Sequence, residues 1–230
     1  NKGDAILDFI GPLGKASDLE RVKQALAAAF ATLPREEVRV ISTAAPHVCR
    51  ESVQHVEDVL DVTQGKLGMG FSCGSDDMPA LLMGNTLFGG SSNSKLFLNV
   101  REKLSLCYYA SSLYHRQKGL ITVSSGIEFQ NYQRAYDEIM AQLEAVQKGE
   151  LEDWELEGAR STLLNNYATV GDSQGKLENF YLGQAATGQH ETPADLARAI
   201  QDMTAERICR AMSTVKLDTV YFLKGKEAEA

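Results

Sequence analysis

Apolar residues recur at every second position in part of the chain, and this pattern constrains the possible folds more than any other feature of the sequence. It runs through residues 51–73 and is clearest at Leu67, Met69, Phe71 and Cys73. Because successive side chains of a strand point to opposite faces, a period of two is typical of strands with one buried face. We therefore expect β-strands in this region.

A second strand signal comes from two apolar runs that lie close together, 106–114 and 120–127. Residues 116–119 between them have the sequence RQKG, which is polar and ends in glycine. Strand-like runs joined by so short a polar loop indicate a β-hairpin. Shorter apolar runs predict two further strands, at residues 5–10 and 219–223.

Most of the remaining chain has the three- and four-residue apolar spacing of helices. Asp76 or Asp77 precedes Met78 and Pro79, which is typical of an N-cap followed by proline in the first turn. Expected helices cover residues 17–34, 78–90, 94–104, 131–149 and several segments up to about 214, with breaks near Gly171, Gly188 and Pro193.

The order of these elements predicts the fold class. Strands joined by a tight loop and followed by several helices favour an antiparallel or mixed sheet. No linker or internal repeat divides the 230 residues. The predicted fold is one α+β domain over residues 1–230, with a mostly antiparallel sheet packed against helices on one face.

The composition is that of a globular protein with an acidic surface. Hydrophobic residues make up 43% and the net charge is −8. This charge argues against nucleic-acid binding, which needs a basic surface, and no apolar run is long enough to span a membrane. The four cysteines are scattered without a C-x-x-C motif, so we expect reduced thiols in a cytoplasmic protein. Since the chain does not begin with methionine, we expect a fragment of a longer protein.

The histidines do not have the spacing of a zinc peptidase. A helical zinc site needs two histidines four residues apart with a glutamate between them. The four histidines are His47, His55, His115 and His190, and neither H-E-x-x-H nor H-x-x-E-H occurs. We therefore predict that this chain holds no metal ion.

Ser72 is the one candidate for a serine nucleophile. Residues 70–74 match G-x-S-x-G between a predicted strand and a predicted helix, and His190 follows downstream. No H-G-G-G-type oxyanion segment precedes it, and the alternation places Ser72 on the strand face opposite Met69 and Phe71. A solvent-facing strand serine is favoured, and a serine hydrolase acting through Ser72 remains a remote alternative.

Two other motifs favour structural roles. Residues 89–95 (GGSSNSK) resemble a phosphate-binding loop at a helix start, but they lack the glycine before Lys95 and a Ser or Thr after it. A turn between helices is the simpler interpretation. Cys107 follows a predicted helix C-terminus, whose partial negative charge disfavours a thiolate, so a buried structural thiol is expected.

Residues 87–108, LFGGSSNSKLFLNVREKLSLCY, resemble a signature of the M16 peptidases (pitrilysin, insulinase-like and processing-peptidase-like proteins). In that family a glycine turn leads to a Ser-Lys/Arg-Leu-Phe helix, then Arg-Glu-Lys, then Leu-x-Tyr at the start of a strand. The order of elements across the chain also resembles one M16 half. The resemblance implies the fold that LuxS shares with the processing peptidases.

The resemblance also implies a function. M16 proteins have two similar halves that enclose a chamber; one half holds zinc in H-x-x-E-H, and the other carries an Arg and a Tyr seven residues apart. These map to Arg101 and Tyr108, which implies a C-terminal half that binds peptide substrate but contains no catalytic residue. Its partner would be an N-terminal M16 half or a homologous M16 subunit in a dimer, and the zinc would lie there.

Departures from the family pattern leave a second interpretation open. The family often has Gly-Leu-Ala-Tyr where this chain has residues 105–108, SLCY, followed by Tyr109. This variant is similar to a bacterial subgroup that lacks the zinc motif and pairs with a zinc-bearing homologue. The alternative function is therefore a non-catalytic M16-like scaffold that pairs with an active homologue.

Overall fold

The structure is a computed structural model that describes residues 16–34 and 50–226. It has two compact units, which are described separately: Asn1–Ala44 with Thr169–Glu191, and Ala45–Ala168 with Thr192–Ala230. In the first unit, α1 spans Ala16–Ala31, η4 is a short 3₁₀ turn at Val170–Asp172, and α5 spans Gln174–Thr187. The helix predicted at residues 17–34 is confirmed, and the strand predicted at 5–10 lies outside the described residues.

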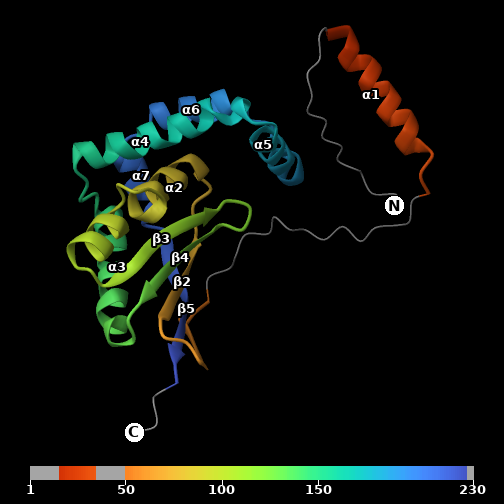
Figure 1. Ribbon diagram of the computed structural model, residues 1–230. Coiled ribbons are helices and arrows are strands. Elements are labelled where there is room, and N and C mark those ends of the chain that lie inside the picture. Colours follow the sequence, from red (N-terminus) through yellow and green to blue (C-terminus); the bar gives the residue numbers. More distant parts are fainter. Residues whose placement is uncertain (1–15, 35–49, 227–230) are drawn as a thin grey trace. The chain divides into compact units, whose positions relative to one another are not determined.

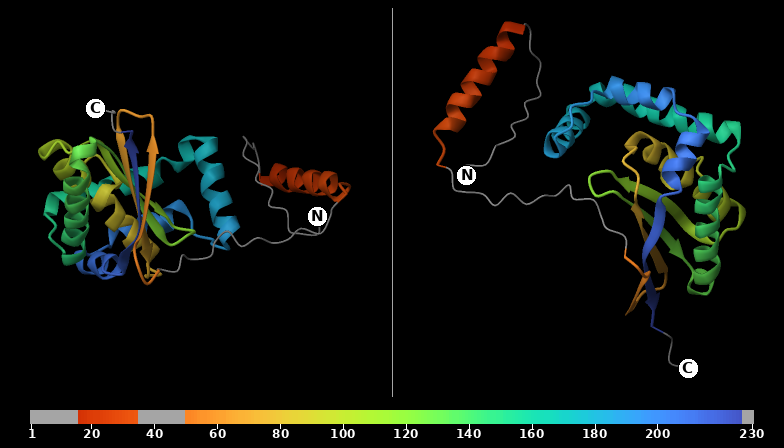
Figure 2. Two further views of the ribbon diagram at one scale, coloured as in Figure 1. Left: turned by 90° about the horizontal axis from the view of Figure 1, so that it is seen from below. Right: turned by 180° about the vertical axis from the view of Figure 1, so that it is seen from behind.

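The second unit contains a five-stranded mixed sheet (Figure 1). The strands lie in the order β1-β5-β2-β4-β3. β1 and β5 run parallel and side by side, and the other neighbours are antiparallel (Figure 2). The bounds are β1 (Gln54–Leu60), β2 (Gly65–Cys73), β3 (Cys107–His115), β4 (Leu120–Ile127) and β5 (Val215–Gly225). The predicted hairpin is β3–β4, and the predicted mostly antiparallel sheet is confirmed.

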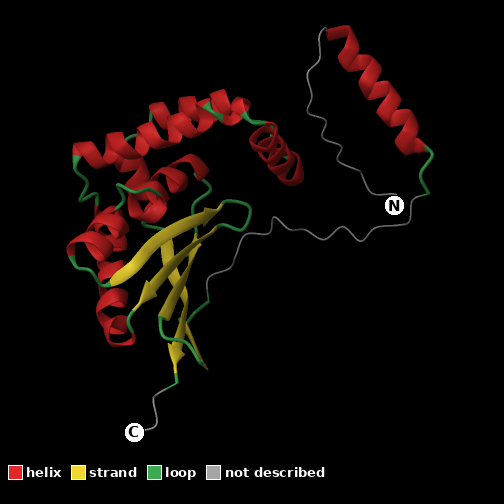
Figure 3. Ribbon diagram, viewed as in Figure 1, coloured by secondary structure: helices red, strands yellow, loops and turns green. Residues whose placement is uncertain are grey.

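Helices pack on one face of this sheet (Figure 3). Two of them, η1 and η2, are π-helices, which are rare and often occur at functional sites. No helix in residues 16–34 or 50–226 is long and apolar enough to cross a membrane. The bounds are α2 (Met78–Asn85), η1 (Thr86–Gly90), η2 (Leu96–Lys103), η3 (Phe129–Asn131), α3 (Tyr132–Lys148), α4 (Asp153–Ala168), α6 (Pro193–Gln201) and α7 (Ala205–Met212).

The core lies between the helices and the inner face of the sheet. Leu67, Met69 and Phe71 of β2 are buried at every second position, and Phe71 meets Phe88 of η1 edge to face at 6.3 Å between ring centroids. Burial of large apolar side chains is the main favourable contribution to folding. The alternation of apolar residues from Leu67 to Cys73 therefore predicts the buried face of β2 correctly.

The same prediction is wrong for β1. Six of its seven side chains are exposed, among them Val56, Val59 and Leu60. The physical reason is position: within the part of the chain that the structure describes, β1 lies at the sheet edge and pairs with β5 alone. Its alternating pattern therefore does not produce a buried face within the described residues.

A buried ion pair connects the start of η2 to the start of α4. Lys95 Nζ lies 3.0 Å from both carboxylate oxygens of Glu155, and the two side chains are only 10% and 6% exposed. Glu155 Oε2 also accepts the main-chain N–H of Glu152 at 2.9 Å. Charges so deeply buried are tolerated because each is matched by the other, and the additional hydrogen bond further stabilises the Glu155 carboxylate.

We expect Lys95→Met to lower the free energy of unfolding by about 3 kcal/mol, since it leaves the Glu155 carboxylate buried without a counter-charge. The double variant Lys95→Met/Glu155→Leu removes both charges and should recover most of that loss. Urea unfolding at neutral pH measures both values. A double variant as unstable as the single variant would show that the buried charge is not the cause.

A second ion pair joins α2 to α7 and makes stability depend on pH. Arg207 Nε and Nη2 donate to the Asp77 carboxylate at 2.6 and 3.0 Å, and Asp77 also accepts the N–H of Ala80 at the N-cap of α2. The hydrogen bond from Arg207 holds the pKa of Asp77 below its usual 3.8, with smaller lowering contributions from the Ala80 N–H and the Arg207 charge.

Because the pKa of Asp77 is lower in the folded state, its contribution to stability should be complete above pH 3.8 and should be lost as the pH falls through the lower folded value. Thermal melting at a series of pH values should show a weaker acid dependence for Asp77→Asn than for the wild type. Asp76→Asn, at the neighbouring position outside this ion pair, is the control and should keep the wild-type dependence.

Candidate functional site

The site begins at the tight turn between η2 and β3. The N–H of Ser105 donates to the carbonyl of Arg101 at 3.1 Å, and the N–H of Leu106 donates to the carbonyl of Val100 at 3.0 Å. Ser105 has φ of 50°, in the left-handed region that non-glycine residues rarely adopt. These features end the helix and direct the chain into β3, so Arg101 lies in the last turn of η2 and Tyr108 near the start of the strand, as the sequence predicts.

A β-bulge places Tyr108 outside the regular pattern of β3. Cys107 is paired with Ile127 and Tyr109 with Gly126, so Tyr108 is the extra residue between them. Bulges disrupt the ladder locally and can redirect a side chain. Tyr108 is 61% exposed, whereas Ala110, two residues later, is buried in the core.

Three contacts fix the position of Arg101. Its Nε donates to the main-chain carbonyl of Tyr108 at 3.0 Å, its Nη1 lies 3.2 Å from the Glu102 carboxylate, and its guanidinium lies over the Phe97 ring at 4.7 Å from the centroid. A cation over an aromatic face and a bond to a carbonyl both restrict the guanidinium. Arg101 therefore has a defined orientation at the end of η2.

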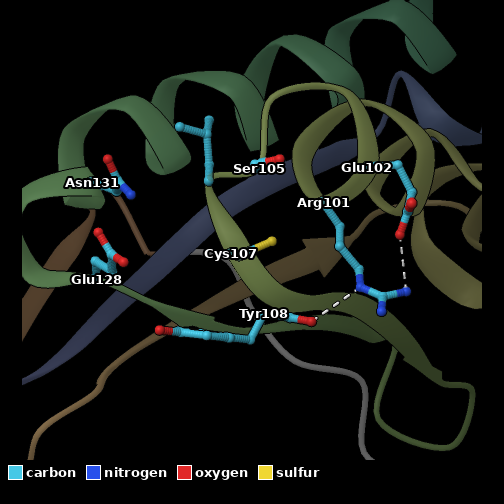
Figure 4. Close-up of a pocket in the computed structure, with 8 residues that line it drawn as sticks. Arg101, Glu102, Ser105, Cys107, Tyr108, Glu128 and Asn131 are labelled. Carbon is cyan, nitrogen blue, oxygen red and sulfur yellow. Dashed lines mark hydrogen bonds and ion pairs between the residues drawn. The ribbon is translucent and has the colours of Figure 1, made fainter.

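Arg101 and Tyr108 line one cavity of about 410 Å³, a size within the range of ligand pockets. The two side chains do not meet: Arg101 bonds the Tyr108 carbonyl, and the Tyr108 phenol extends away from the guanidinium (Figure 4). The cavity thus has a cationic end at Arg101 and a phenolic end at the Tyr108 hydroxyl. Its lining residues are Arg101, Glu102, Ser105, Leu106, Cys107, Tyr108, Glu128 and Asn131.

Sequence reasoning did not single out Glu128 and Asn131. They lie where β4 ends and α3 begins, on the side toward which the Tyr108 phenol extends (Figure 4). The hairpin register was the available signal, since pairing outward from the 116–119 loop brings the end of β4 beside the start of β3. The bulge at Tyr108 shifts that register by one residue, which no sequence pattern indicates.

Cys107 is part of the cavity lining but is not activated as a nucleophile. Burial raises the pKa of its thiol, while the nearby Ser125 hydroxyl and the charge of Arg101 act in the opposite direction. A raised pKa keeps the thiol protonated at neutral pH. Burial likewise raises the pKa of Cys73 to about 12. The inert thiol expected for Cys107 agrees with this environment, but the side chain is only half-buried, not buried as predicted.

The structure gives Ser72 no catalytic geometry. It lies on the β2 face opposite Met69 and Phe71, as predicted, but the solvent-facing position is wrong: Ser72 is only 4% exposed because β2 lies between β4 and β5. Its hydroxyl contacts the main-chain carbonyl of Lys216 at 3.5 Å. β2 also continues through Ser72 to Cys73 without the sharp turn of a nucleophile elbow.

The remaining candidates have structural partners. In a phosphate-binding loop the lysine would contact the ligand, but Lys95 forms an ion pair with Glu155. The interpretation of residues 89–95 as a turn therefore agrees with the structure. His115 Nε2 is 2.9 Å from the Thr122 hydroxyl in the hairpin. Within residues 16–34 and 50–226, no group of three or more His, Cys, Asp or Glu side chains is arranged to hold a metal ion, so these residues do not fit a zinc centre.

Comparison with known proteins identifies the family. Residues 16–163 match the model of the peptidase M16 inactive domain. The chain is 38% identical over 217 residues to a protein of Bacillus subtilis named probable inactive metalloprotease YmfF, and the match covers 91% of this chain and 50% of that protein. The chain belongs to the peptidase M16 inactive-domain family. It spans about half the length of this curated relative, and the family assignment made from residues 87–108 is confirmed.

Solved structures have the same fold. A conserved protein from Enterococcus faecalis is 28% identical and superposes with a TM-score of 0.79, covering 90% of this chain and 51% of that one. A peptidase M16 inactive domain from Pseudomonas fluorescens, 17% identical, has a TM-score of 0.73 and covers 94% of this chain and 53% of that one. The predicted M16-like α+β fold is therefore confirmed.

The left-handed backbone at Ser105 gives a direct test of the turn that positions Arg101. Ser105→Gly should raise the free energy of unfolding by about 1 kcal/mol, because glycine adopts positive φ without steric cost. Ser111→Gly, in the exposed face of β3, should instead lower it by about 0.5–1 kcal/mol. Urea denaturation compares the two variants. Equal destabilisation by both would contradict the strained turn.

Proposed function

We propose that this chain is the non-catalytic half of an M16 peptidase-like protein. In this proposal it supplies a substrate-binding surface and part of the chamber wall for peptide hydrolysis at a zinc site in another half. The observation that carries the proposal is that Arg101 and Tyr108 line one cavity in an M16 inactive-domain fold. Residues 1–230 would form a single C-terminal-type domain of a longer two-half protein.

The chemistry of the two side chains suits a bound peptide. Arg101 uses Nε and Nη1 in contacts within the chain, and Nη2 makes no hydrogen bond in the described part of the chain, so it is available to a substrate carbonyl. The exposed Tyr108 hydroxyl can donate to a second carbonyl, or to the oxyanion that forms during hydrolysis. The bulge and the carbonyl contact at Tyr108 hold these donors apart, at two ends of the cavity.

The zinc would be supplied from outside this chain, in an N-terminal half or in a homologous subunit of a dimer. Such a zinc ion would polarise the scissile carbonyl and activate water. This chain's own residues would bind the peptide on either side of the reacting bond and exclude water from the closed chamber. Support for a second half comes from the length of the curated relative, of which this chain matches 50%.

A second candidate function is a non-catalytic scaffold that pairs with an active M16 homologue. The name of the B. subtilis relative, probable inactive metalloprotease, favours it, because that whole protein is about twice the length of this chain. In that case both halves of the parent protein would lack zinc, and the active centre would belong to a separate chain. Arg101 and Tyr108 would then bind peptide without assisting its hydrolysis.

The two functions differ in one kinetic prediction. The chain is combined with a zinc-bearing M16 half or subunit from its own source, and cleavage of a fluorogenic peptide is measured. Tyr108→Phe should lower kcat by about 10²-fold if the phenol donates to the oxyanion. Tyr109→Phe is the matched control, since the Tyr109 hydroxyl lies 3.4 Å from Ser124 and outside the cavity, and it should leave kcat unchanged.

Unchanged kcat in Tyr108→Phe together with a raised KM would favour the scaffold function over the catalytic half. Peptide cleavage by the isolated chain, which has no zinc motif, would contradict both. Zinc analysis of the isolated chain accompanies the assay, and stoichiometric zinc would likewise contradict both functions.

A further inference from the structure

The charges around the cavity do not balance. Arg101 is compensated by Glu102, whose carboxylate lies 3.2 Å from Nη1. Glu128, which also lines the cavity, forms no ion pair in the described part of the chain; its carboxylate accepts a hydrogen bond at 2.9 Å from the neutral side chain of Gln130. The cavity therefore has a neutralised cationic end and an acidic end without a cation.

Groups that suit a cation gather at the acidic end. The Tyr108 phenol extends toward the side where Glu128 and Asn131 lie (Figure 4), and its exposed ring is the one aromatic side chain among the described residues that line the cavity. An ammonium or guanidinium over a tyrosine face is attracted by the ring, and a carboxylate nearby adds to that attraction. The Asn131 side chain oxygen can accept a further N–H.

We propose that the end of the cavity formed by Tyr108, Glu128 and Asn131 binds a lysine or arginine side chain of an extended peptide whose main chain is held at Arg101. This inference rests on the proposed function, because it requires that the cavity binds peptide. It adds the class of peptide, which has a basic residue next to the carbonyl that accepts a hydrogen bond from Arg101. A cavity of about 410 Å³ has room for a long side chain and the adjoining main chain.

The same arrangement selects against acidic side chains. A carboxylate at this end would face Glu128 without a cation to offset the repulsion, since Arg101 is at the other end and paired with Glu102. An aliphatic side chain would contact the Tyr108 ring but would gain nothing from Glu128. The expected order of affinity is therefore basic, then aliphatic, then acidic.

The test uses the full chain and three fluorescein-labelled octapeptides of alanine and serine that differ only at one central position, which is lysine, norleucine or glutamate. Fluorescence anisotropy gives the three dissociation constants at low ionic strength. The lysine peptide should bind about fivefold more tightly than the norleucine peptide, as expected for one partly exposed charge pair with an aromatic contact. This difference should shrink as salt is added, because exposed charges are screened.

Glu128→Gln should abolish the preference for lysine over norleucine while retaining the binding of norleucine. Glu138→Gln is the matched control, since Glu138 also accepts a hydrogen bond from a neutral glutamine, Gln142, and lies outside the cavity. It should keep the wild-type preference. Circular dichroism melts confirm that both variants are folded.

The outcomes separate this inference from the proposed function. Binding of all three peptides with equal affinity, or a lysine preference that survives in Glu128→Gln, would overturn the assignment of the basic subsite and leave peptide binding intact. Failure of the folded wild-type chain to bind any of the three would overturn the proposed function, and this inference with it.

Discussion

The buried contact between Lys95 and Glu155 is the interaction on which the geometry of the cavity depends. It attaches the first residue before η2 to the first turn of α4, at a distance of 3.0 Å and almost out of contact with water. Because η2 is short and ends in the turn at Ser105, the position of its start sets where the backbone of Arg101 lies, and the contacts with Phe97, Glu102 and the Tyr108 carbonyl then orient the side chain. Because separating the two charges would leave each of them buried without its partner, the pair holds the start of η2 against α4.

Much of the fold could be predicted from local patterns, because burial and backbone chemistry act over short distances. The alternation around Met69 identified β2, the loop at 116–119 identified the hairpin, and Asp76 or Asp77 before Met78 and Pro79 marked the start of α2. Exposure of β1 could not be predicted, since it depends on which strand lies at the edge of the sheet. Burial of Ser72 could not be predicted either, since it depends on β2 having a strand on each side.

The candidate site likewise contains residues that local sequence indicates and residues that depend on tertiary structure. Arg101 and Tyr108 were found because a motif fixes their spacing across one turn. Glu128 was not found from the sequence. It lies at the cavity because β4 pairs with β3, and the bulge at Tyr108 shifts the register of that pairing. Arg101 contacts the Tyr108 carbonyl instead of its phenol, and the motif did not indicate this either. Local motifs thus indicate which residues take part, and tertiary register decides how they face each other.

Because of the bulge, Tyr108 is under different sequence constraints from the neighbouring residues of β3. Residues of β3 on either side of it, such as Ala110, must fit the core, and changes there are restricted by packing. Tyr108 belongs to neither face of the strand, so its side chain can change without a cost in the core or in the pairing with β4. Related chains could therefore acquire or lose ligand recognition at this position by single substitutions while retaining the same stable scaffold.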